Sequence, residues 1–189
     1  MTTMPILFVF HGTGRNANDY LAARIHTAQQ KHTLVFALEF PADTYSSSQY
    51  IEGGMYSGNN ILPETSWTFS LIEPLFDYIK KETGSEQTHY DMFGHSAGAQ
   101  FVHRFMTFKP TNRVNRGVSA NAGWYTVPDF SISYPYGLKN SPATTQGVSA
   151  FFAKKFILHL GTADNDPNDS SLNHSAGADA QGLYRYARG

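Results

Sequence analysis

Residues 90–98 read YDMFGHSAG, and this stretch decides the fold of the chain. Its first four residues form a short β-prone run, and residues 99–109 continue as an apolar, helix-like segment that stops before Pro110. The five residues GHSAG between them match the pattern G-x-S-x-G, which requires a strand before it and a helix after it. Because both neighbours are of the required kind, the stretch predicts a sharp strand-to-helix turn.

The turn predicted at residues 94–98 has consequences for the serine at its centre. Side chains at the flanking positions would not fit a turn this tight, which explains Gly94 and Gly98. Ser96 would then lie at a helix N-terminus, where partial positive charge favours a developing anion. The pattern therefore predicts Ser96 as a nucleophile. An ordinary serine in a glycine-rich turn is the structural alternative.

Outward from this stretch, apolar runs alternate with segments of helical periodicity. The expected strands are residues 5–10, 33–38, 90–93, 116–120 and 156–160, and the expected helices include residues 16–30 and a helix that begins near Ser70. Such alternation predicts a mostly parallel sheet with helices on both faces. We expect one domain over residues 1–189, an α/β sandwich of three layers with about five mostly parallel strands.

Two helix ends and three loops can also be predicted. Ser70 and Glu73 have the spacing of a capping box, and Gly84 is expected to end the same helix. Residues 41–64 are rich in Pro, Ser, Gly and Asn and predict a long loop. Residues 124–146 and 161–182 predict irregular structure, and residues 182–189 are typical of the start of a helix.

Composition excludes several classes of protein. The 189 residues include no cysteine, which excludes a disulfide scaffold and a thiolate metal site. The net charge is −1 without a basic block, so we expect no nucleic-acid partner. No apolar run approaches the ~18 residues of a membrane span, and no secretory signal begins the sequence, so we expect a cytoplasmic protein. No cofactor and no metal site are predicted.

Two further elements complete a candidate active site. Residues 11–14, HGTG, follow the first strand, where a loop beside the nucleophile would supply one half of an oxyanion hole. We predict the backbone N–H groups of Thr13 and Ala97 for this role, with His11 holding the loop. Asp164 follows the strand 156–160 and is predicted as the acid that supports a base. A turn-capping role is the alternative for Asp164.

Aromatic residues near the same edge of the sheet predict a substrate pocket. Trp124 and Tyr125 follow the strand 116–120, and Tyr56 lies in the long loop. Strand ends of this kind form ligand sites in open α/β sheets, so we predict these three as substrate-binding. Packing of the irregular segment over the sheet is an equal alternative.

Five short segments resemble the α/β-hydrolase superfamily. They are FHGTG at 10–14, WTF at 67–69, FGHSAG at 93–98, NAGWYT at 121–126 and GTAD at 161–164. Within the superfamily they are similar to the branch labelled poly(3-hydroxybutyrate) depolymerase-like or esterase-like. The resemblance covers nearly the whole chain. It implies a Ser/Asp/His triad, with Ser96 as nucleophile and Asp164 as acid, acting on a small-molecule or polymeric ester.

The base of this triad is the one element that departs from the family pattern. The superfamily takes its histidine from a loop after one further strand, and His174 is the sole histidine that follows Asp164. Two interpretations follow. Either the chain is truncated at its C-terminus and lacks the usual base and last strand, which we favour, or His174 serves as a relocated base. His159 lies within an expected strand and is predicted to pack in the core.

The leading functional hypothesis is a serine hydrolase that cleaves carboxylic esters through an acyl-enzyme on Ser96. Acyl transfer to an alcohol would use the same residues. The alternative is a catalytically impaired or non-catalytic binding protein that lacks its base. A missing last strand would also expose a sheet edge, which favours homo-oligomers.

Overall fold

Five parallel strands form the central sheet of the computed structural model, which describes residues 2–189. They are β1 (Ile6–Phe10), β2 (Leu34–Leu38), β5 (Tyr90–His95), β6 (Val114–Ala120) and β7 (Lys155–His159). Their order across the sheet is β2-β1-β5-β6-β7, with every neighbouring pair parallel. The α/β sandwich with about five parallel strands predicted from the sequence is confirmed.

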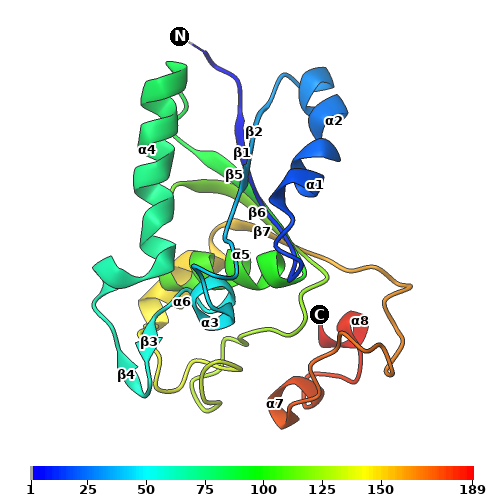
Figure 1. The fold of residues 1–189 in the computed structure, drawn as a ribbon. Coiled ribbons are helices and arrows are strands. Elements are labelled where there is room, and N and C mark those ends of the chain that lie inside the picture. Colours follow the sequence, from blue (N-terminus) through cyan, green and yellow to red (C-terminus); the bar gives the residue numbers. More distant parts are fainter. Residues whose placement is uncertain (1) are drawn as a thin grey trace.

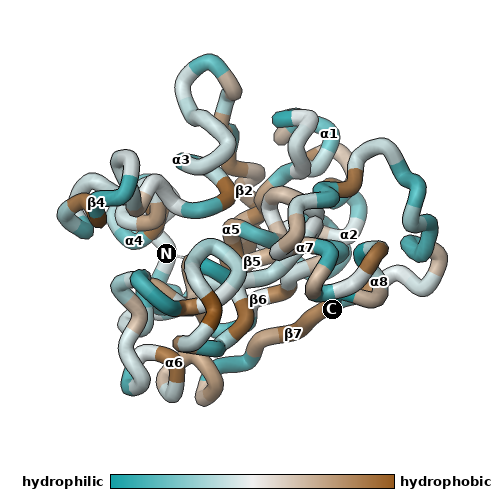
Figure 2. Tube along the Cα trace, turned by 90° about the horizontal axis from the view of Figure 1, so that it is seen from below, coloured by the Kyte–Doolittle hydropathy of each residue, from teal (hydrophilic) through white to brown (hydrophobic). Residues whose placement is uncertain are grey.

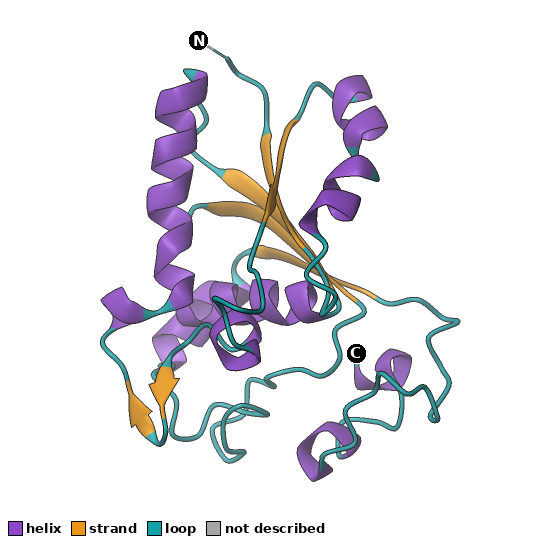
Figure 3. Cartoon of the chain, viewed as in Figure 1, coloured by secondary structure: helices purple, strands orange, loops and turns teal. Residues whose placement is uncertain are grey.

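The helices cover both faces of this sheet (Figures 1 and 3). They are α1 (Ala17–Ala22), α2 (Ile25–Gln30), α3 (Ser47–Ile51), α4 (Ile72–Thr83), α5 (Ala97–Phe108), α6 (Thr145–Phe152), α7 (Ala176–Asp179) and α8 (Arg185–Arg188). Figure 1 shows α1 and α2 on one face and α4, α5 and α6 on the other. A two-stranded hairpin of β3 (Tyr56–Ser57) and β4 (Asn60–Ile61) lies apart from the sheet.

Aromatic packing joins β1 to the helices on one face. The ring of Phe8 lies 6.4 Å from Phe76 of α4 and 4.9 Å from Tyr90 of β5. Phe10 stacks on Phe101 of α5 at 4.5 Å. All five of these rings are almost fully buried, so they form the centre of the hydrophobic core. No helix among residues 2–189 is both long and apolar enough to cross a membrane.

The chain order across the sheet determines where a site can form. From β1 the chain passes to β2 on one side and later returns to β5 on the other side. Ligands bind in open α/β sheets at such a reversal, outside the carboxyl ends of the strands. The register pairs Phe10 of β1 with Gly94 of β5, so the segments that follow these two strands begin side by side.

Several local predictions need correction. The helix expected over residues 16–30 is interrupted at residues 23 and 24 and forms α1 and α2. The capping box predicted at Ser70 is absent, because its hydroxyl donates to the carbonyl of Glu64 and two 3₁₀ turns precede α4. A capping box does form, at Ser46 and Gln49 of α3, inside the segment predicted as a loop. Gly84 ends α4 in the left-handed conformation, as predicted.

The strand β7 is the exposed edge of the sheet. Ile157 and Leu158 are 45% and 43% exposed, and they point to opposite faces of the strand. Figure 2 shows this strand as an apolar segment at the rim of the molecule, close to α6 and α8. His159 is exposed as well, so the prediction that it packs in the core is wrong. A strand at the edge has a neighbour on only one side, so one row of its backbone N–H and C=O groups has no partner strand.

Candidate active site

Ser96 lies at the sharp turn between β5 and α5 that the sequence predicts. Its backbone has φ 55° and ψ −113°, a conformation that L-residues rarely adopt. A Cβ on Gly94 would lie 2.0 Å from the carbonyl oxygen of Gly98, and a Cβ on Gly98 would lie 2.2 Å from that of Phe10. The two glycines therefore allow β5, α5 and β1 to approach closely, and this approach fixes the position of the Ser96 backbone.

The loop after β1 lies directly beside this turn. A Cβ built on Gly12 would be 3.7 Å from the Cβ of Ser96. The N–H of Arg15 donates to the carbonyl of Gly12 at 3.2 Å, which closes a tight turn around Thr13. Within residues 2–189, the N–H groups of Thr13 and Ala97 donate to no other residue. Both predicted oxyanion donors are thus close to Ser96 in the fold and have no internal partner.

His11 holds the loop in place from within the protein. Its Nδ1 donates to the carbonyl of Gly12 at 2.9 Å, and its Nε2 accepts the N–H of Phe40 at 3.2 Å. The hydroxyl of Tyr50 donates to the backbone carbonyl of His11 at 2.8 Å. Burial lowers the pKa of the His11 imidazole, which favours the neutral form. His11 is therefore a structural residue, because both of its ring nitrogens are occupied.

Asp164 follows β7 and Ser96 follows β5. Because these strands are parallel, both residues come after the carboxyl ends of their strands, on the same side of the sheet. Oδ1 of Asp164 lies 3.1 Å from Nη1 of Arg185, and its backbone carbonyl accepts the N–H of Tyr186. The carboxylate therefore binds the first turn of α8. Within the described residues, no histidine is hydrogen-bonded to Asp164.

Within the described residues, His174 is hydrogen-bonded neither to Ser96 nor to Asp164. Its Nδ1 lies 3.0 Å from Oδ1 of Asp179, and the same oxygen accepts a hydrogen bond from Arg188. The His174 side chain is 48% exposed. Among residues 2–189, the hydroxyl of Ser96 has no hydrogen-bond partner, histidine or other. The predicted contacts of His174 with Asp164 and Ser96 are absent from this arrangement.

Two other histidines near the turn are already engaged. His103 of α5 is buried, and its ring nitrogens contact the carbonyl of Ala99 at 3.2 Å and the N–H of Thr126 at 3.1 Å. His95, which precedes the serine, has its Nδ1 2.7 Å from the hydroxyl of Tyr20. Burial lowers the pKa of both imidazoles. The pairing of Tyr20 with His95 has no sequence signal, because 75 residues separate them.

The three predicted substrate-binding aromatics each make contacts within the protein. Trp124 and Tyr125 are only 5% and 7% exposed, so neither offers an open ring face. Trp124 packs between the guanidinium of Arg104, 4.1 Å away, and the ring of another tyrosine. The hydroxyl of Tyr56 donates to the carbonyl of Asn140 at 2.7 Å. The contacts of Trp124 and Tyr125 agree with the alternative that the segment after β6 packs over the sheet.

A buried arginine supports this region, and the sequence does not predict it. Arg104 of α5 is fully buried, and its Nε donates to the hydroxyl of Thr126 at 2.8 Å while its Nη1 donates to the carbonyl of Ile51 at 2.8 Å. Its Nη2 has no partner within the described residues. The side chain therefore joins α3 and the segment after β6 to the middle of α5, the helix that begins at the candidate nucleophile.

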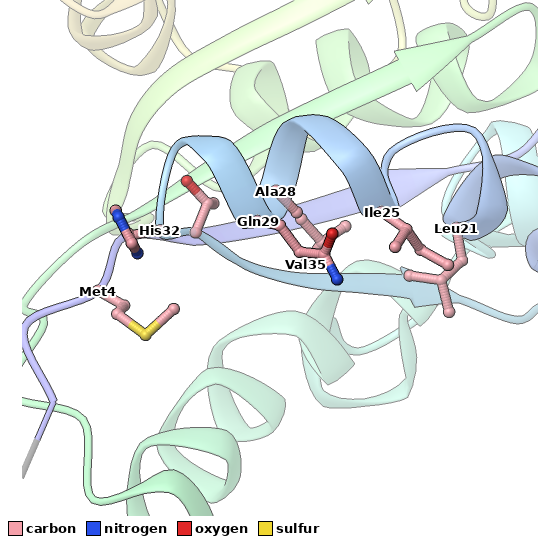
Figure 4. Close-up of a pocket in the computed structure, with 8 residues that line it drawn as sticks. Met4, Leu21, Ile25, Ala28, Gln29, His32 and Val35 are labelled. Atoms are coloured by element: carbon pink, nitrogen blue, oxygen red, sulfur yellow. The ribbon is translucent and has the colours of Figure 1, made fainter.

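Other features of the surface are separate from this site. A pocket of about 440 Å³ lies between α1, α2 and β2. Figure 4 shows Leu21, Ile25 and Ala28 of the two helices next to Val35 of β2, and Ser96 is not among the lining residues. Within residues 2–189, no three His, Asp or Glu side chains converge in a way that could hold a metal ion.

The fold and the turn at Ser96 define an α/β-hydrolase. The structure superposes on poly(aspartic acid) hydrolase-1 from Sphingomonas sp. KT-1 with a TM-score of 0.97 and 44% sequence identity, covering 100% of this chain and 72% of that protein. It superposes on LpqC, a poly(3-hydroxybutyrate) depolymerase from Bordetella parapertussis, with a TM-score of 0.92 and 30% identity, covering 99% of this chain and 64% of that one. The chain therefore belongs to the α/β-hydrolase family of poly(aspartic acid) hydrolase-1.

More distant structures share the fold alone. The siderophore hydrolase EstB from Aspergillus nidulans superposes with a TM-score of 0.51 and 13% identity over 97% of this chain. No protein-family model and no curated protein matches the sequence. The chain spans less than two thirds of the length of LpqC.

Proposed function

We propose that this chain carries the nucleophile and the oxyanion hole of a serine hydrolase that cleaves carboxyl ester or amide bonds. The observation that carries the proposal is the backbone of Ser96, held at a rarely populated φ and ψ between two glycines beside the loop of Thr13. A strained conformation persists only where the surrounding structure enforces it, and such strain gathers at active sites.

In the proposed reaction, the hydroxyl of Ser96 attacks the acyl carbon, the bond to the alcohol or amine breaks, and this leaving group takes up the proton of the hydroxyl. Water then cleaves the acyl-enzyme, which releases the carboxylic acid and restores the hydroxyl of Ser96. The carbonyl oxygen becomes an oxyanion that accepts hydrogen bonds from the N–H groups of Thr13 and Ala97. Both groups lack another partner in the described chain, so they are available without rearrangement. Asp164 is proposed as the acid that orients the base. Arg185 binds only Oδ1 of Asp164, so in that role Oδ2 would accept the N–H of the imidazole.

The proposed substrate is a polymer or a small molecule joined by such bonds. The two relatives are named for the hydrolysis of poly(aspartic acid) and of poly(3-hydroxybutyrate), which are chains of amide and of ester units. Their chemistry differs in the leaving group but shares the attack on an acyl carbon. This shared step is what we transfer to Ser96.

A fluorophosphonate probe tests the proposal, because it reacts with activated serines. We expect the wild-type chain to be labelled and Ser96→Ala to remain unlabelled. Ser119→Ala is a matched control, since Ser119 is buried on β6 and its hydroxyl donates to the carbonyl of Ala99. Equal labelling of wild type and Ser96→Ala would refute the proposal.

A second candidate function is a non-catalytic or impaired hydrolase-like protein that binds a ligand. The observation that favours it is the lack, within residues 2–189, of an imidazole hydrogen-bonded to Ser96 or to Asp164. A serine hydroxyl without a base is a weak nucleophile. This candidate predicts a folded chain that resists the probe, with a melting temperature raised by an ester or amide oligomer that is not turned over.

A further inference from the structure

Three segments far apart in the sequence meet at Gly12, beside the candidate nucleophile. A Cβ built on Gly12 would lie 3.2 Å from the hydroxyl of Tyr20, 3.7 Å from the Cβ of Ser96 and 4.0 Å from Nδ1 of His95. Tyr20 belongs to α1, and His95 is the last residue of β5. Gly12 itself precedes Thr13, a proposed oxyanion donor. The bare Cα of Gly12 is what lets these groups converge.

The hydroxyl of Tyr20 connects two of these segments. It lies 2.7 Å from Nδ1 of His95, and it packs on the Cα of Gly12, where a Cβ would be only 3.2 Å from it. We assign the hydroxyl of Tyr20 as the donor and Nδ1 of His95 as the acceptor of this hydrogen bond. Tyr20 therefore links the oxyanion loop, through its packing on Gly12, to the residue before Ser96, through a hydrogen bond.

The surroundings of His95 favour the neutral imidazole, which is the form that can accept a hydrogen bond from Tyr20. Burial lowers the pKa of His95, and the nearby cations Arg185 and Arg24 lower it further, whereas Asp164 acts in the opposite direction. A neutral imidazole has one acceptor nitrogen, and a proton on Nε2 leaves Nδ1 free to accept from Tyr20. Burial also raises the pKa of Tyr20, so its hydroxyl keeps the proton that it donates.

We infer that Tyr20 is a positioning residue, which holds the Thr13 N–H and the Ser96 turn in register through Gly12 and His95. The inference rests on the proposed function, since the register matters for catalysis only if Ser96 is the nucleophile. Tyr20 does not act on the substrate itself. Oxyanion donors must lie within hydrogen-bond reach of the developing anion, so the loss of this link acts on the transition state more than on substrate binding.

The test compares Tyr20→Phe with Tyr90→Phe. Both variants remove one hydroxyl that is hydrogen-bonded to another side chain, but the hydroxyl of Tyr90 donates to Glu73, at the opposite end of β5 from the serine. With a p-nitrophenyl ester, we expect Tyr20→Phe to lower kcat on the order of tenfold with KM unchanged. Tyr90→Phe should leave kcat within about twofold of wild type. A fall in kcat that is equal in the two variants would refute the inference.

A second measurement separates this inference from the proposed function. In ¹⁵N spectra of the uniformly labelled chain, we expect wild-type His95 to carry its proton on Nε2, and Tyr20→Phe to give a mixture of both tautomers with shifted amide signals of Thr13. Tyr90→Phe should leave these signals in place. If the wild-type chain neither reacts with the probe nor hydrolyses the ester, the proposed function fails, and this spectrum alone decides whether Tyr20 holds the loop. An unchanged His95 tautomer in Tyr20→Phe would overturn the inference.

Discussion

Replacing Gly98 with alanine should displace the candidate nucleophile, because the added methyl group has no space. The new Cβ would lie 2.2 Å from the carbonyl oxygen of Phe10 and 2.6 Å from its carbonyl carbon. A carbon atom and a carbonyl oxygen approach to about 3.3 Å at closest. The start of α5 and the end of β1 must therefore separate by about 1 Å. Both contacts are with backbone atoms, so a change of rotamer cannot relieve them.

The expected magnitude follows from this displacement. Overpacking of a well-packed core costs about 1–3 kcal/mol, and a clash with the backbone of β1, which has a neighbouring strand on each side, belongs at the upper end. A loss of about 3 kcal/mol lowers the melting temperature of a domain of this size by roughly 6–12 °C. A misplacement of about 1 Å in a catalytic site can reduce the rate on the order of 100-fold, and we expect probe labelling of Ser96 to fall by about that factor.

The assay is thermal unfolding followed by circular dichroism, together with the rate of fluorophosphonate labelling at 25 °C. Gly123→Ala is the matched control, since a Cβ there would meet only the side chain of Gln100, at 3.7 Å, which is an ordinary contact. Its melting temperature should stay within about 2 °C of wild type, since the expected cost is at most about 0.5 kcal/mol. If Gly98→Ala melted and reacted like Gly123→Ala, close backbone packing would not be what holds the turn at Ser96.

Three further outcomes are expected. His174→Ala should label within about threefold of wild type, because its imidazole binds Asp179 and not the site; a loss as complete as that of Ser96→Ala would show that the segment after Asp164 closes over the serine. Thermal stability should fall from pH 7 to pH 5, because burial lowers the pKa of the imidazoles of His11, His95 and His103. Below about pH 6.5 the unfolded chain binds protons that the folded chain does not, at a cost of about 1.4 kcal/mol per pH unit for each imidazole that stays neutral. A melting temperature that is constant over this range would contradict the lowered pKa values. Elution from a size-exclusion column should depend on concentration, because β7 exposes an apolar edge, and Leu158→Lys should remove that dependence; a wild-type chain that elutes as a monomer at all concentrations would contradict it.

Much of the fold could be predicted because its signals are local. The strand at residues 90–95, the glycines at 94 and 98 and the helix after them occupy one continuous stretch, so the turn at Ser96 follows from the sequence order alone. Gly84 needs only its own left-handed backbone to end α4. Pro74 fits within the first turn of that helix, where a missing N–H leaves no hydrogen bond unmade.

The predictions that failed depend on neighbours that a local pattern does not contain. Ser70 and Glu73 have the spacing of a capping box, but Glu73 binds Arg113, 40 residues away, and accepts the hydroxyl of Tyr90. His159 lies in an apolar strand, but that strand is at the edge of the sheet and has one neighbour. Local spacing describes what a side chain is able to do, and the partners available in the fold decide what it does.

The sequence by itself determined the alternation of strands and helices, the turn at Ser96 and the class of protein, because each depends on residues close together in the chain. Only the tertiary structure decided how the groups around Ser96 are paired. It placed Tyr20 against His95, Asp164 against Arg185 and His174 against Asp179. The physical reason is that a hydrogen bond or an ion pair acts over about 3 Å, and for most of these pairs only the packing of the sheet and its helices brings the partners that close.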